Sequence, residues 1–167
     1  MRTKQTLLVA ALTALLGGVA TANTNVNFKF DSAALSPGAE TALADVAAKA
    51  IGRSGQRVVL DGHADPVGAS PYNVGLSLRR AEAVKDKLIS LGVDSERIVI
   101  SAYGEDKPAG ATNAAKRRVR IWMTELSVNQ VVAQAFASNG TSVHWDRPLT
   151  VAELDMPAGA TDAVASR

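Results

Sequence analysis

The sequence predicts an α/β protein, built as a two-layer sandwich in which two helices pack against one mixed, four-stranded sheet. Four short segments show the alternation of apolar and polar residues that is typical of half-buried strands. Two longer segments between them begin with Ser-Pro and end in glycine, as many amphipathic helices do. The resulting order, β-α-β-α-β-β, places both helices on one face of the sheet.

The first strand and first helix follow directly on each other. VNFKF, residues 26–30, alternates in the strand pattern. Ser36 can then cap a helix whose first position is Pro37, and Gly52 lies where this helix should end.

The second strand and second helix repeat this plan. Residues 57–62, in QRVVLDGHAD, predict a strand that ends in a glycine-containing turn. Ser70 is the expected cap of the next helix, Pro71 lies in its first turn, and Gly92 follows its end.

The last two predicted strands are separated by a loop. RIVISAYG, residues 97–104, predicts the third strand, and a stretch rich in Gly, Pro and Asn follows it. KRRVRIWMTE predicts the fourth strand, whose alternation puts different side chains on its two faces: Val119, Ile121 and Met123 on one, and Arg118, Arg120 and Trp122 on the other.

Residues 1–22 have the layout of a secretory signal peptide. Arg2 and Lys4 precede a short apolar run, and Ala-Thr-Ala ends at residue 22 as a cleavage site. The apolar run is shorter than the ~20 residues of a membrane span. We therefore expect export to the periplasm and a mature chain that begins near Asn23.

Composition excludes several classes of function. The 167 residues include 18 Lys and Arg against 16 Asp and Glu, and removal of Arg2 and Lys4 leaves 16 against 16. A neutral mature chain gives no argument for nucleic acid as a partner. The chain has no cysteine, so disulfides, thiolate metal sites and a lipoprotein anchor on cysteine are not expected. The histidines are His63 and His144, too few for a histidine-rich metal site, and no cofactor is predicted.

Residues 126–167 are predicted to form a C-terminal extension, partly disordered, with one short helix. Ser127 and Gln130 have the spacing of a capping box. Beyond Gly140 no period is sustained. The helix could dock on the domain itself or on a partner protein, through a stripe formed by Val128, Val131, Val132, Ala135 and Phe136.

Arg80 lies inside the apolar arc of the second predicted helix, between Leu76 and Val84. A buried guanidinium needs anionic or carbonyl partners, and Asp65 lies in the turn that leads into the same helix. Two interpretations remain open from the residues alone. Asp65 and Arg80 form a structural ion pair, or they bind the ammonium and the carboxylate of a zwitterionic ligand.

Several separated motifs resemble the OmpA-like peptidoglycan-binding domain. GHADPVGASPYNVGLSLRRA is similar to the family pattern G-H-T-D-x-x-G followed by Y-N-x-x-L-S-x-x-R-A. NFKFDS, SAYGEDKP and KRRV resemble its opening strand, its G-x-G-E-x-x-P segment and its closing N-R-R-V strand. The resemblance covers about residues 26–124 and assigns residues 23–125 to one such domain.

The resemblance implies noncovalent, nonenzymatic binding of cell-wall peptidoglycan through the diaminopimelate residue of its stem peptide. The two residues that clamp this ligand in the family correspond to Asp65 and Arg80. Further positions that match the pocket of the family are Asp31, Asn73, Leu76 and Arg117, with Arg118 as an alternative cation. For Asn73, helix capping is an equally good interpretation.

Departures from the family pattern predict a weaker site. Ala64 replaces the threonine of G-H-T-D, Ala33 stands where a polar residue is common, and Lys116 replaces the asparagine of N-R-R-V. Asp65 and Arg80 should still allow the site to bind its ligand, because charge-assisted hydrogen bonds are stronger than the neutral hydrogen bonds that these replacements remove.

Two other functions are compatible with parts of the sequence. A glycoside hydrolase would need two of the carboxylates of Asp61, Asp65 and Glu105 to meet in space. A protein-interaction or scaffold module would act through the C-terminal extension, with Asp65 and Arg80 only a structural ion pair. Without a membrane anchor of its own, the mature chain would associate with the outer membrane through an envelope protein partner.

Overall fold

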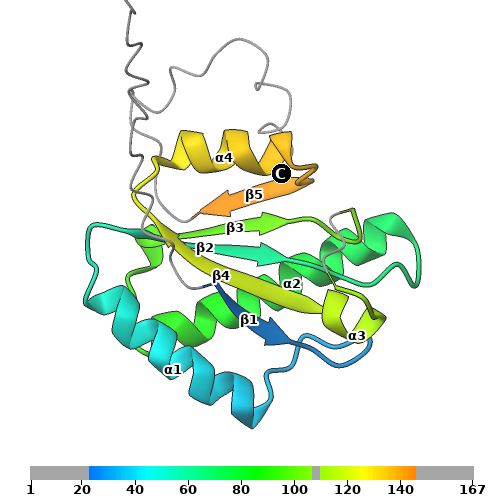
Figure 1. Cartoon of the computed structure of the whole chain (residues 1–167), viewed down its shortest axis with the longest axis horizontal. Coiled ribbons are helices and arrows are strands. Elements are labelled where there is room, and N and C mark those ends of the chain that lie inside the picture. Colours follow the sequence, from blue (N-terminus) through cyan, green and yellow to red (C-terminus); the bar gives the residue numbers. More distant parts are fainter. Residues whose placement is uncertain (1–22, 107–109, 146–167) are drawn as a thin grey trace, which may run out of the picture.

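The computed structural model describes residues 23–106 and 110–145 (Figure 1). Five strands form one sheet in the order β1-β4-β2-β3-β5. The strands are β1 (Thr24–Asn27), β2 (Arg57–Gly62), β3 (Ile98–Ala102), β4 (Arg118–Thr124) and β5 (Ser142–Trp145). The helices are α1 (Pro37–Ile51), α2 (Ser70–Ser90), α3 (Asn113–Lys116) and α4 (Val128–Ala137), with a 3-10 turn η1 at Ser95–Arg97.

The predicted fold class is confirmed. β2 and β3 are parallel and every other neighbouring pair is antiparallel, so the sheet is mixed. The predicted signal peptide, residues 1–22, and the end of the predicted extension, residues 146–167, lie outside the described residues.

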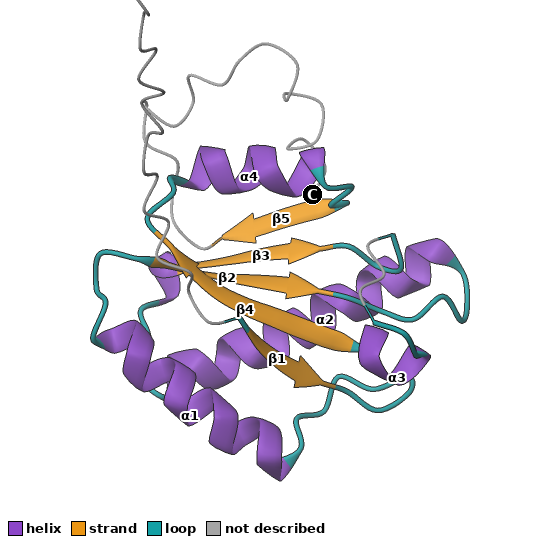
Figure 2. Cartoon of the chain, in the orientation of Figure 1, coloured by secondary structure: helices purple, strands orange, loops and turns teal. Residues whose placement is uncertain are grey.

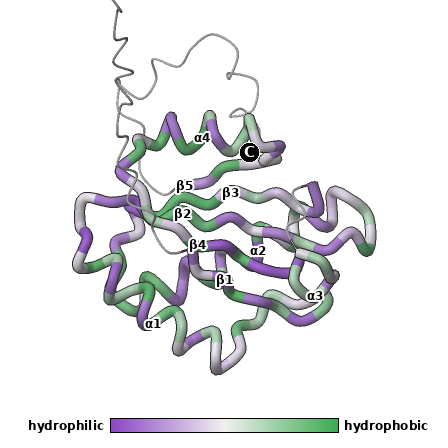
Figure 3. The backbone as a smooth tube through the Cα atoms, in the orientation of Figure 1, coloured by the Kyte–Doolittle hydropathy of each residue, from purple (hydrophilic) through white to green (hydrophobic). Residues whose placement is uncertain are grey.

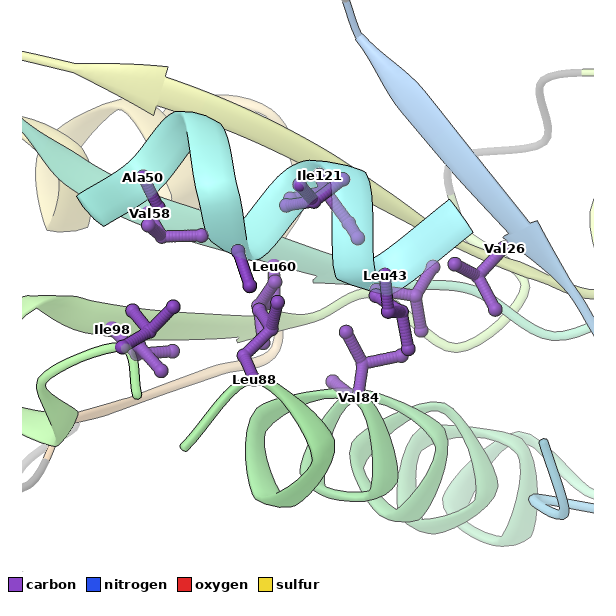
Figure 4. Packing of buried hydrophobic residues seen from close by; sticks show 14 of the residues in the cluster. Val26, Leu43, Ala50, Val58, Leu60, Val84, Leu88, Ile98 and Ile121 are labelled. Atoms are coloured by element: carbon purple, nitrogen blue, oxygen red, sulfur yellow. The ribbon is translucent and has the colours of Figure 1, made fainter. Parts of the chain in front are cut away.

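The first face of the sheet is covered by α1 and α2, as predicted (Figure 2). Side chains from all four predicted strands and both helices meet there, and Figure 4 shows Leu43 of α1 and Leu88 of α2 pointing toward the sheet. Both side chains are fully buried. This layer holds the start of α2 against the ends of the strands, where the candidate site lies.

The second face is covered in part by α4, and here the prediction of helices on one face is incomplete. Val131 of α4 belongs to one buried apolar cluster with Val59 of β2 and Val99 of β3. The predicted capping box is confirmed. The Ser127 hydroxyl accepts from the backbone N of Gln130 at 3.3 Å, and the Gln130 side-chain oxygen accepts from the backbone N of Ser127 at 2.9 Å. The apolar stripe of α4 is therefore used inside the domain.

The fifth strand was not predicted. β5 pairs with β3 in antiparallel register, with Ser142 opposite Ala102. Without β5, the hydrogen-bonding groups of β3 would form an open edge of the sheet. The predicted four-stranded sheet is thus extended by one strand from the C-terminal segment.

Several element boundaries differ from the predictions. Ser36 caps α1 as expected, accepting from the Ala39 N at 3.2 Å. The N-cap of α2 is Ala69 and not Ser70, and no side chain caps this helix. β1 ends at Asn27, before the predicted Phe30. The loop after β3 contains the short helix α3.

Gly62 allows α2 to lie directly on β2. A Cβ atom at this position would lie 2.2 Å from the Ser77 carbonyl oxygen. The Ser77 hydroxyl in turn accepts from the Gly104 N at 3.1 Å, which ties the helix to the end of β3. Within the described ranges, none of the helices has the length and apolar character of a membrane span.

Candidate functional site

A pocket of about 180 Å³ lies where three segments of the chain meet. The segments are the loop after β1, the loop after β2 and the first turns of α2. The pocket is lined by Phe30, Asp31, Asp65, Val67, Gly68, Tyr72 and Leu76. Three predicted site residues, Asp31, Asp65 and Leu76, therefore line one cavity.

Asp65 forms an ion pair with Arg117. Its Oδ2 accepts from Arg117 Nη1 at 2.8 Å, and its Oδ1 accepts from the Val67 N at 3.3 Å. Asp65 is 4% exposed, so this pair is shielded from solvent. The structural ion pair expected between Asp65 and Arg80 is not present among the described residues, and Arg117 takes the partner position.

Arg80 lies behind the pocket and has no exposed surface. Its Nε donates to the Ser32 carbonyl at 2.9 Å, its Nη1 to the His63 carbonyl at 3.0 Å and its Nη2 to the Lys29 carbonyl at 3.1 Å. The guanidinium carbon also lies 5.4 Å from the centre of the Phe28 ring. One side chain thus holds together the loop after β1 and the loop after β2.

The charge of Arg80 is only partly compensated. Burial lowers the pKa of its guanidinium from the ordinary value, and the field of Asp65 acts in the opposite direction. Its three hydrogen bonds go to neutral carbonyl groups and use three of the five N–H groups of a guanidinium. Two N–H groups of this guanidinium are therefore left for a further acceptor.

Asp31 and Tyr72 close one side of the pocket. The Tyr72 hydroxyl donates a short hydrogen bond to Asp31 Oδ1, which joins the loop after β1 to the first turn of α2. Asp31 has a φ of 48°, a left-handed conformation that aspartate tolerates better than most residues. The hydrogen bond to Asp31 raises the pKa of Tyr72.

Asn73 is buried beside this cavity, at 1% exposure. Its Nδ2 has no hydrogen-bond partner among the described residues. Its Oδ1 lies close to Gly68, which lines the pocket: a Cβ atom built on Gly68 would be 3.7 Å from this oxygen. The interpretation of Asn73 as a helix cap is wrong, because Ala69 holds the cap position without a side-chain hydrogen bond.

The rim of the pocket is apolar. Phe30, Val67 and Tyr72 are 60%, 49% and 47% exposed, and all three line the cavity. These residues were not predicted from the sequence to be part of the site. Phe30 and Tyr72 are the sequence neighbours of the predicted site residues Asp31 and Asn73, and this adjacency could have indicated that they belong to the site. Exposed apolar groups at a cavity mouth commonly mark a binding surface.

The other basic and acidic candidates point elsewhere. Arg118 donates to the Ala115 carbonyl at 3.1 Å, so Arg117 is the cation of the two that reaches the pocket residues. Asp61 forms an ion pair with Arg120 and accepts from Trp122 Nε1 at 3.0 Å. Asp61 and Asp65 are therefore each committed to a different arginine, which does not favour the hydrolase alternative.

His63 packs in the protein interior, as a lone histidine at a strand end usually does. Its ring stacks on Tyr103 with 5.1 Å between the ring centres. Burial, and then the field of Asp61, raise the pKa of Tyr103 to about 12. In the described part of the chain, no group of three or more potential ligands is placed to hold a metal ion.

The chain is similar to a known protein family and to several of its members. The model of the OmpA family matches residues 27–121. The peptidoglycan-associated lipoprotein of Pseudomonas aeruginosa is 41% identical over 103 residues, which cover 59% of this chain and 61% of that protein. Outer membrane protein A of Bordetella avium is 32% identical over 106 residues, covering 64% of this chain and 55% of that protein.

A solved structure shows the same fold. The peptidoglycan-associated lipoprotein from Burkholderia pseudomallei aligns with a TM-score of 0.56 and 28% sequence identity. The alignment covers 60% of this chain and 89% of that structure. The family match ends before α4 and β5, and the chain spans less than two thirds of the length of the two curated relatives named above.

Proposed function

Because the chain belongs to the OmpA family, we propose that it binds cell-wall peptidoglycan noncovalently, through the diaminopimelate residue of the stem peptide, in the pocket between Asp31 and Asp65. The names of the relatives, peptidoglycan-associated lipoprotein and outer membrane protein A, support a wall-binding role in the cell envelope. They also favour a nonenzymatic role. The pocket geometry is the observation that carries the assignment to diaminopimelate.

The charges around the pocket suit a zwitterion. Asp31 and Asp65 supply two carboxylates, and Arg80 and Arg117 supply two guanidiniums. These four charges sum to zero. The free end of diaminopimelate carries one ammonium and one carboxylate, so it adds no net charge while placing an opposite charge beside each kind of group.

Each part of this ligand has a matching group. The ammonium would lie against Asp65 and Asp31. The carboxylate would take the remaining N–H groups of Arg80 and the free amide donor of Asn73. The N-terminal end of α2 adds a favourable electrostatic field for this anion. Because Arg80 is fully buried, this contact requires the loops that cover it to move.

The apolar rim fits the rest of the side chain. Diaminopimelate has a short hydrocarbon chain between its two charged ends. Phe30 and Val67 expose apolar surface at the pocket mouth, where this chain would pass. An apolar wall around a few polar groups is the usual composition of a small-molecule site.

Sedimentation with purified sacculi tests the proposal. We expect the wild type and Asp86→Asn, which changes an exposed carboxylate on the same helix α2, to sediment with diaminopimelate-type walls. Asp65→Asn should bind at least about tenfold more weakly, since one charge-assisted hydrogen bond contributes ~1.5–3 kcal/mol. Lysine-type walls, whose diamino acid lacks the distal carboxylate, should be bound less by the wild type. Equal binding of both wall types would exclude diaminopimelate as the recognised group.

The alternative role as a protein-interaction or scaffold module loses its main support. The stripe on α4 that would have bound a partner packs against Val59 and Val99. Self-docking, the other interpretation of this helix, accounts for its apolar residues. Association with the outer membrane through an envelope protein remains a proposal.

A further inference from the structure

The second face of the sheet has an open groove of about 690 Å³ at its β1 and β4 side. It lies away from α4, which packs on β3 and β5 (Figure 1). Figure 3 shows hydrophilic residues along β4, whereas β2 and β3 are largely hydrophobic. The side chains that give the groove its polar character are Asn23, Asn25, Asn27, Arg118 and Arg120.

The asparagines of this groove are unexpected in a strand. Asn23, Asn25 and Asn27 alternate along β1 and the residue before it, so they share one face, and all three are exposed. Asparagine is depleted in strands, where β-branched and aromatic residues are favoured. An exposed edge strand is commonly protected by charged residues or proline, and β1 contains neither. Neither the stability of the strand nor the protection of its edge accounts for the three asparagines.

The opposite strand completes a regular array of hydrogen-bonding groups. Asn25 lies opposite Arg120 and Asn27 opposite Arg118 in the antiparallel register of β1 and β4. Residues two apart on a strand are ~6.6–6.8 Å apart. Each amide offers two donors and an acceptor, and each guanidinium offers only donors. The groove therefore presents repeated donors and acceptors along a line.

Two guanidiniums contribute to the lining of the groove. Arg120 pairs with Asp61, and Arg118 is 7% exposed and donates to the Ala115 carbonyl. Burial, and then the neighbouring charge of Arg120, lower the pKa of Arg118. A ligand with many hydroxyl and carbonyl acceptors matches a surface lined by amide and guanidinium donors.

We infer that this groove binds the glycan strand of peptidoglycan, as a second ligand surface beside the pocket for the stem peptide. The inference rests on the proposed function, because it assigns the polymer to which that peptide is attached. Sugar hydroxyl and acetamido groups recur along such a strand and pair with amides and guanidiniums. Arg117 connects the two sites, since its Nη1 donates to Asp65 and its Nε donates at 3.3 Å to the carbonyl of Phe28, a groove residue.

Two soluble probes separate the two surfaces: peptide-free glycan strands and the free diaminopimelate-containing stem tripeptide. In the double variant Asn25→Thr/Asn27→Thr, threonine favours the strand and removes the amides. We expect this variant to bind glycan strands about tenfold more weakly, since each lost hydrogen bond contributes ~0.5–1.5 kcal/mol, and to bind the tripeptide as the wild type does. Gln134→Thr, which removes an exposed amide from α4, should leave both affinities unchanged.

The outcomes distinguish this inference from the proposed function. Asp65→Asn should lose the tripeptide and keep the glycan. If the wild type binds the tripeptide but not the glycan, or if the double variant binds glycan normally, the glycan surface is refuted and the proposed function stands. If the tripeptide is not bound, the proposed function fails. If the double substitution changes only the oligomeric state in sedimentation equilibrium, the groove contacts a second copy of the chain, and the glycan assignment is wrong.

Discussion

The Asp65 carboxylate and the Arg117 guanidinium lie 2.8 Å apart and connect the loop after β2 to the residue that precedes β4. Both side chains are largely shielded, at 6% and 17% exposure for Asp65 and Arg117. The ion pair therefore fixes one wall of the pocket before any ligand binds. Preorganised charges of this kind lower the cost of binding, because fewer groups must be ordered by the ligand.

A double-mutant cycle on Asp65→Asn and Arg117→Ala should reveal coupling between the two residues. We expect an interaction free energy of about 0.5–3 kcal/mol in urea unfolding, the range for residues in direct contact. The same cycle with Asp86→Asn in place of Asp65→Asn should give no coupling, because Asp86 is exposed on α2. A zero interaction energy for Asp65 and Arg117 would contradict a stable ion pair in solution.

Arg80→Lys should destabilise the fold although it keeps the positive charge. A lysine ammonium cannot hold the carbonyls of Lys29, Ser32 and His63 in the fixed fork geometry of arginine. The loss should be on the order of 3–5 kcal/mol in the free energy of unfolding, because buried carbonyls lose their donors. Arg79→Lys is the matched control, exposed on the same helix, and should change stability by less than about 0.5 kcal/mol.

The two tyrosines should titrate separately in an absorbance titration of the folded protein. Tyr72 and Tyr103 both have raised pKa values, and that of Tyr103 is about 12. Asp31→Asn should lower the pKa of Tyr72 toward its ordinary value of about 10 and leave Tyr103 unchanged. The raised values favour the neutral phenol in the folded state. Their contribution to stability is therefore complete below pH ~10 and is lost as the pH rises through the folded values.

Gly62→Ala should destabilise the protein by about 1–3 kcal/mol or more, the usual cost of overpacking. The added methyl group would meet the Ser77 carbonyl at 2.2 Å and force α2 away from β2. Gly38→Ala is the control, because no atom of the surrounding structure lies within 4 Å of where a Cβ atom would stand at this position of α1. It should leave stability unchanged or raise it by up to about 1 kcal/mol. Thermal or urea unfolding that ranks the two variants equally would refute the close contact.

Val131→Ala tests the docking of α4. Val131 is 1% exposed and belongs to the same apolar cluster as Val59 and Val99, so the truncation should cost about 1–3 kcal/mol. Binding to sacculi should be unchanged under folding conditions, because the pocket is formed by other elements. Reduced wall binding by folded Val131→Ala protein would show that α4 is coupled to the site.

Local signals in the sequence predicted the core elements well. Ser36, Pro37 and the glycine after α1 act through neighbouring residues, so their effect is readable without the fold. Arg80 was identified because a cation in an apolar helical arc conflicts with the pattern around it. The same conflict does not say which groups satisfy the cation, and these proved to be backbone carbonyls distant in sequence.

Features that depend on long-range geometry were missed or assigned differently. The partner of Asp65 lies 52 residues away in sequence and is set by the register of β4. β5 has only four residues and is specified by the free edge of β3, not by a strong local pattern. The N-cap of α2 is Ala69 and not Ser70, because the path of the loop into the helix decides where the helix begins. The sequence pattern does not locate this start to within one residue.

The placement of β5 has a consequence for self-association. The central strands β2, β3 and β4 are all internal to the sheet, and the two outer strands, β1 and β5, have only four residues each. Short edges offer few free main-chain groups on which another molecule could add a strand. Loss of β5 would leave the main-chain groups of β3 that now pair with it as an open edge of the sheet, on which another strand could add. β5 thus covers an edge of β3 that would otherwise be open to pairing with another chain.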